Sequence, residues 1–150
     1  MPKPTASDAD VILKLYDLRR ESEMRKARNW WGATFWPENA DEFMKLAMDM
    51  ESQQSAWLRQ VAGYWNMAAT LALAGAVNQE LFLNPSCSGE MYFVFAKVKP
   101  FLKELRQKMN APDMFGPVEE IIESSKKSRE FMKSMEKRMT ERRKRMSAKA

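Results

Sequence analysis

The sequence predicts an all-α protein: a single irregular bundle of four to five helices around a central apolar helix, with an extended basic helix at the C-terminus. The 150 residues include only five glycines and seven prolines, most of them in short clusters between long runs that hold neither. Apolar residues in those runs recur at the three- and four-residue spacing of a helix face. Strand-like alternation is absent apart from the short aromatic stretch MYFVFAKV, which continues at helical spacing.

The first helix is expected to run to about Asn29. Ser7 can cap it, with Asp10 three residues later. Val11, Leu15 and Leu18 recur on one face of it. Acidic residues come early and basic residues late, as the helix dipole favours.

An aromatic segment, WWGATFWPENADEF, follows this helix. Its rings are Trp30, Trp31, Phe35 and Trp36. We interpret it as a turn whose rings fold back and close the end of the bundle, because buried rings dominate the energetics of small cores. The alternative is an aromatic platform that binds a base or a ligand ring in a pocket. Asn39, with Glu42 three residues later, predicts the start of a second helix.

The middle of the chain predicts a short helix near 40–50 and a long one near 53–83. The long helix is the expected centre of the bundle because nearly every face between Met67 and Val77 is apolar. Three polar residues of this region are expected to be buried and to need hydrogen-bond partners: Asn66, Asn78 and Glu80.

Two prolines punctuate the rest of the chain. The segment LNPSCSGE is expected to be a loop that caps a helix over 90–109, which Pro100 should kink or restart. Pro117 suits the first turn of a last helical segment that meets no breaker before Ser147. We therefore divide the chain into a helical bundle, residues 1–117, and a basic, methionine-rich helix with a frayed end, residues 118–150.

The residue content argues against most enzyme classes. There is no histidine and a single cysteine, Cys87, so histidine-dependent nucleophiles, most catalytic zinc sites and an internal disulfide framework are missing. No glycine-rich phosphate loop occurs. We expect a non-enzymatic protein that needs no metal or cofactor.

The location is predicted from the same features. A lone cysteine fits a reducing compartment. No secretory signal is visible, and the longest uncharged stretch is too short to cross a bilayer. We expect a cytoplasmic protein without a transmembrane segment.

The C-terminal segment concentrates positive charge. Residues 126–150 hold eleven Lys and Arg against three Glu, whereas the preceding residues hold 14 basic and 17 acidic residues. Its apolar positions repeat at alternating spacings of three and four, the pattern of a coiled-coil seam. Methionine fills gaps without fixing geometry, and Arg142 disfavours a tight core, so an adaptable helix-in-groove contact fits better than a strong coiled coil.

We predict that this helix binds a protein partner or a second copy of the chain. The residues expected to dock are Phe131, Met132, Met135, Met139 and Met146. The residues expected to steer the encounter are Arg142, Arg143, Lys144 and Arg145.

Three other interpretations stay open. The same basic residues would contact phosphates in a nucleic-acid-associated protein, although Glu130, Glu136 and Glu141 lower the free positive potential. A helix lying on an anionic membrane is the weaker interpretation, because Trp and Leu are missing from its apolar face. The plainest one is a solvated, fraying tail.

Two segments carry a family resemblance: GYWNMAATLALAGAVNQELF and KVKPFLKELRQKMNAPDMFGPVEEI. They resemble a group of uncharacterised bacterial all-helical proteins. The matching positions are Gly75, Glu80, Phe82, Pro100, Phe101 and Arg106. The resemblance implies a helical fold and supplies no catalytic residues. It covers about half of the chain and stops before the basic segment.

Overall fold

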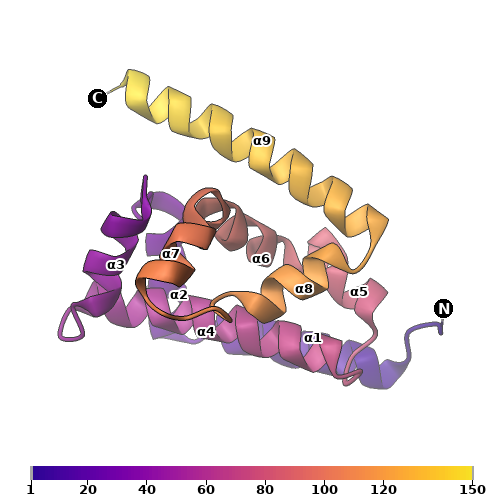
Figure 1. Cartoon of the computed structure of the whole chain (residues 1–150). Helices are drawn as coiled ribbons and strands as arrows, with labels where there is room; N and C mark the ends of the chain where they lie inside the picture. Colours follow the sequence, from indigo (N-terminus) through magenta and orange to yellow (C-terminus); the bar gives the residue numbers. More distant parts are fainter. Residues whose placement is uncertain (1, 150) are drawn as a thin grey trace.

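The computed structural model describes residues 2–149, and helices make up most of them (Figure 1). Their bounds are α1 Ala6–Arg19, α2 Ser22–Ala33, α3 Ala40–Met48, α4 Gln53–Leu73, α5 Gln79–Leu83, α6 Pro85–Val98, the 3-10 turn η1 Lys99–Phe101, α7 Leu102–Lys108, α8 Gly116–Glu123 and α9 Lys126–Ala148. The predicted all-α bundle is confirmed. The chain turns more often than predicted, and each extra turn has a local cause.

Helix α4 is the centre of the bundle, as predicted, and it packs against α2, α3, α5 and α8. Its inward face carries Leu58, Val61 and Trp65, followed by the small residues Ala68 and Ala72. The helix ends at Leu73 and not near residue 83. The cause is a glycine C-cap: Gly75 has a φ of 82°, its N–H donates to the Ala72 carbonyl, and the next N–H donates to the Leu71 carbonyl.

The expected first helix is two helices, with a break at Arg20–Glu21. Thr5 caps α1 in a capping box with Asp8, so the predicted capping pair of Ser7 and Asp10 is wrong. The carboxylate of Glu21 accepts hydrogen bonds from the N–H groups of Glu23 and Met24, at 3.1 and 2.9 Å. Glu21 thereby caps α2 and starts a new helix inside a segment whose apolar pattern is continuous.

The aromatic residues after the first helices close one end of the core, as predicted. Trp30 stacks on Phe35 with ring centroids 4.5 Å apart, and Trp31 meets Phe35 edge-on at 4.8 Å. All three are buried. Trp30 and Trp31 lie within α2, whereas the prediction placed them in a turn. Trp36 is only half-buried and belongs to the cluster described below.

The expected cap and proline breaks are present, with a shifted start for α6. Asn39 caps α3 by accepting from the Glu42 N–H at 2.9 Å. Helix α6 begins at Pro85, because Asn84 caps it, and not at Glu90. The helical path is interrupted at η1, around Pro100, and Pro117 is the second residue of α8.

The polar residues of the core are mostly not the predicted ones. Glu80 is exposed, Asn78 is half-buried as the cap of α5, and Asn66 is half-buried on α4. The buried polar side chains of the described residues are Arg19, Ser55, Ser88, Lys97 and Ser128. A half-turn difference in helix orientation decides which polar group enters the core, and the sequence pattern did not resolve it.

Helix α9 runs across the molecule along α6, with the C-terminus at its far end (Figure 1). It is separate from α8 because the Ser125 hydroxyl accepts from the Ser128 N–H at 3.1 Å and caps a new helix. Val118 and Ile121 of α8 and Met132 of α9 join the same apolar core as α4 and α6. The boundary proposed at residue 117 therefore does not divide two separate cores. Within residues 2–149, no helix combines the length and apolarity that a membrane span requires.

Candidate functional site

The inner face of α9 consists of the seam seen in the sequence. Ser128, Met132, Met135 and Met139 follow one another at spacings of four, three and four, and all are buried. The Tyr92 hydroxyl donates to the Leu83 carbonyl, so its 2.9 Å contact with Ser128 is a hydrogen bond from the serine. Phe131 is half-buried and lies edge-on to the Tyr92 ring at 4.7 Å.

The predicted docking residues are thus divided by the structure. Met132, Met135 and Met139 pack inside the chain, and the prediction that they form an exposed docking stripe is wrong. The pattern was correct as a helix–helix seam, but its partner is the chain itself, chiefly α6. Met146 lies in the same direction further along the helix and remains 40% exposed.

The outer face of α9 carries two basic stripes. Because successive residues turn by about 100° around a helix, one stripe comprises Lys126, Lys133, Lys137 and Lys144. The other comprises Lys127, Arg138, Arg142, Arg145 and Lys149. Glu130 and Glu141 lie between the two stripes. Among the residues that the structure describes, the only ion pair of either stripe is Lys126–Glu130, at 4.0 Å.

The predicted cluster Arg142–Arg145 is likewise divided. Arg143 points inward and donates to the carbonyls of Pro37 and Lys97, at 2.9 and 3.2 Å. Its burial lowers the pKa of its guanidinium. Arg142 lies 5.0 Å from the centre of the Trp36 ring. Lys144 and Arg145 are exposed on opposite stripes. Arg143 is therefore a clamp that holds α9 on the bundle, and the other three remain available.

A buried lysine that the sequence did not single out lies beneath this clamp. The Lys97 amine donates to the carbonyls of Trp31 and Phe35 at the end of α2, and it lies 3.7 Å from the centre of the Trp36 ring. Burial, with a smaller effect of Arg142 and Arg143, lowers the pKa of Lys97 to about 7.

An amine of this pKa would be a strong nucleophile if a substrate could reach it. Lys97 is fully buried, however, and its amine is hydrogen-bonded to two main-chain carbonyls. We assign it a structural role: it caps the end of α2 and links that end to α6. Its sequence signal is a lysine in the otherwise apolar run YFVFAKV.

A second polar cluster joins α1 and α2 to α4 and α6. The Glu90 carboxylate accepts from Arg28 at 2.7 Å and from the Trp65 indole at 3.0 Å. Arg19 donates to the Tyr64 hydroxyl at 3.1 Å, and that hydroxyl donates to the Leu15 carbonyl at 2.6 Å. Burial raises the pKa of Tyr64, which keeps the phenol neutral as this hydrogen bond requires. The cluster is complete in itself, and we assign it to helix positioning.

The variant Glu90→Ala tests that assignment. It leaves Arg28 and the Trp65 indole without their partner, and we expect a loss of about 2–3 kcal/mol in the free energy of unfolding, below the 3–5 kcal/mol of a fully buried pair. Urea denaturation at pH 7 measures it. The control is Glu23→Ala, which removes the exposed pair with Lys26 and should cost about 0.5 kcal/mol. Equal losses in the two variants would contradict the assignment.

The fold and this surface define a class: an all-α domain whose C-terminal helix closes the core with one face and presents basic stripes on the other. The chain belongs to a family described as a domain of unknown function, DUF4760, whose model matches residues 4–127. The match ends at the first turn of α9, so the basic helix lies almost wholly beyond it. No curated protein and no solved structure matches the chain.

Proposed function

We propose that this protein is a non-enzymatic binding module that associates with nucleic acid through phosphate contacts along the outer face of α9. The observation that carries the proposal is the pair of basic stripes, which are exposed along the helix and nearly free of ion pairs within residues 2–149. Condensed counterions released from a nucleic acid by such cations provide a favourable, sequence-independent binding free energy.

The composition of this face favours phosphates over the other anionic partners. A protein interface is built around buried apolar or aromatic anchors, and the methionines that would have supplied them are in the core. A membrane-bound helix also needs an apolar face that enters the lipid. Phosphate binding needs only lysine and arginine at suitable intervals. The sequence-based prediction of a protein partner therefore loses its apolar part, and its electrostatic part is retained here.

The dimensions of α9 suit a duplex. Its 23 residues span about 35 Å at 1.5 Å per residue, and the stripe from Lys126 to Lys144 spans about 27 Å. A duplex carries one phosphate charge per about 1.7 Å of axis, so several lysines can each meet a phosphate. The lone cysteine and the resemblance to bacterial proteins support a bacterial cytoplasmic location, which stays a prediction.

The test is the salt dependence of binding to a fluorescein-labelled 20-base-pair DNA duplex, measured by fluorescence anisotropy between 50 and 200 mM KCl (roughly the range over which phosphate contacts are resolved). We expect a Kd on the order of 10⁻⁴ to 10⁻⁶ M near physiological salt. The triple variant Lys133→Gln/Lys137→Gln/Lys144→Gln should reduce the slope of log K against log salt by about 0.9 for each phosphate that the protein no longer neutralises, up to about 2.7.

The matched control is Lys14→Gln/Lys45→Gln/Lys103→Gln, which removes the same charge from exposed lysines outside α9. It should bind as the wild type does. Equal weakening by both triple variants would show an effect of net charge and contradict the assignment to α9. Absence of binding to both duplex and single-stranded probes at 50 mM (about the lowest salt of the series) would contradict the proposal. Binding to phosphatidylserine vesicles in their place would point to a membrane partner.

A further inference from the structure

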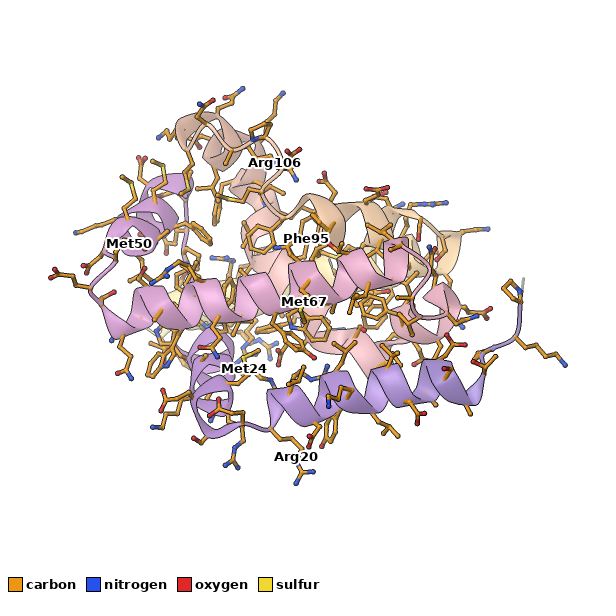
Figure 2. The ribbon with its side chains drawn as sticks, turned by 90° about the horizontal axis from the view of Figure 1, so that it is seen from below. Arg20, Met24, Met50, Met67, Phe95 and Arg106 are labelled. Atoms are coloured by element: carbon orange, nitrogen blue, oxygen red, sulfur yellow. The ribbon has the colours of Figure 1, made fainter. Side chains whose placement is uncertain are left out.

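A groove on the other side of the molecule is lined almost entirely by apolar side chains. It has a volume of about 660 Å³. Its walls come from α3, the turn after it, α4, and the segment that joins α7 to α8. Four methionines contribute: Met48, Met50, Met109 and Met114. Figure 2 shows Met50 near the junction of α3 and α4. No residue of α9 lines the groove, so it is separate from the proposed phosphate-binding face.

One polar side chain in this lining is incompletely paired. Asn66 of α4 donates from Nδ2 to the Ala62 carbonyl at 3.0 Å, which fixes the orientation of its amide. Its Oδ1 is buried and has no hydrogen-bond partner in the described chain. A buried acceptor without a donor costs about 1–3 kcal/mol, and native structures retain few such groups. A donor at this point of the groove would recover that hydrogen bond.

The charged residues of the lining set the charge of a suitable ligand. Arg59 and Asp113 are both exposed, and they carry opposite charges. They therefore favour neither a cation nor an anion over the groove as a whole. The remaining lining is methionine, alanine, phenylalanine and proline, and methionine adapts its shape to different apolar partners. An uncharged apolar molecule is the ligand that these residues accommodate best.

We propose that this groove binds an uncharged, elongated apolar molecule that carries one hydrogen-bond donor, such as the hydroxyl of a long-chain alcohol, and that the donor pairs with Asn66 Oδ1. The volume lies within the range of about 300–1,000 Å³ that small-molecule sites occupy. The apolar lining supplies most of the binding free energy through loss of water-exposed area. Asn66 supplies the discrimination between a ligand with a donor and the same ligand without one.

The experiment compares two ligands of similar length, 1-decanol and decyl methyl ether, which differ in the donor. Each displaces N-phenyl-1-naphthylamine, a neutral fluorophore with a single N–H donor, from the full-length protein. We expect the alcohol to bind about threefold to tenfold more tightly than the ether, the contribution of one net hydrogen bond. In Asn66→Leu this preference should vanish, because the acceptor is gone.

A second pair of variants keeps the test independent of Asn66. Ala62→Trp places a large ring in the groove and should abolish binding of the fluorophore. Its control, Ala56→Trp, adds the same ring at an exposed position of α4 outside the groove and should leave binding unchanged. The proposal is overturned if wild-type protein does not enhance the fluorescence, if alcohol and ether bind equally, or if Ala62→Trp binds as the wild type does.

Discussion

Replacing Met132 with glutamate should lower the free energy of unfolding by about 3–5 kcal/mol, the range found when a buried charge is left without a partner. The side chain is 1% exposed and lies in the seam between α9 and the bundle. A carboxylate there would have to remain charged in an apolar site or take up a proton, and both cost free energy. The loss is measured by urea denaturation followed by far-UV circular dichroism at pH 7.

The control for this prediction is Met146→Glu, on the same side of α9 but 40% exposed. It should change stability by no more than about 0.5 kcal/mol, as exposed substitutions do. Similar effects at the two positions would contradict the packing of α9. The same reasoning predicts that a chain ending at Ser125 exposes Tyr92 and its neighbours and loses cooperative unfolding. It would not leave an intact bundle that merely fails to self-associate.

The second large effect concerns pH and Lys97. Burial lowers the pKa of Lys97 to about 7, whereas a lysine in the unfolded chain titrates near 10.4. Between these values the unfolded state binds more protons than the folded state. The free energy of unfolding must then rise with pH across this window, by at most about 1.4 kcal/mol per pH unit. Below about pH 7 both states hold the proton and the contribution levels off.

The prediction is measured as a difference between the wild type and Lys97→Met at pH 7 and pH 9 (roughly the lower half of the window). The wild type should gain about 2 kcal/mol more than the variant over this interval. Charged groups near Lys97 come from other elements: Arg142 and Arg143 of α9, and beyond them Glu38 and Glu42. These arginines and carboxylates keep their charge from pH 7 to 9, so they do not produce the difference.

An exposed lysine provides the control for the pH experiment. Lys103→Met, at an exposed position of α7, should follow the wild type at both pH values. If Lys97→Met also follows the wild type, the Lys97 amine keeps its proton in the folded state. The low pKa would then be wrong, and the contacts with the Trp31 and Phe35 carbonyls and the Trp36 ring would be holding the charge.

Several features of the fold could be predicted because they depend on neighbouring residues. The low glycine and proline content indicates helices, Pro100 marks an interruption, and Asn39 marks a cap. The apolar run around Met67–Val77 identifies the central helix. Breaks at Glu21 and Ser125 were missed because a side-chain cap competes with a helix pattern that continues through it. Gly75 carried a visible signal for the end of α4, which the apolar residues around it obscured.

The sequence by itself determined that this is a helical protein, and that residues 118–146 carry one apolar seam and a basic remainder. Only the tertiary structure decided what covers that seam. Residue spacing specifies which side chains share a face of a helix, but the same face can pack on a partner, on a second copy or on the same chain. Here α6 covers it, so the methionines belong to the core, Lys97 and Arg143 become clamps, and the lysine and arginine stripes are what α9 presents to solvent.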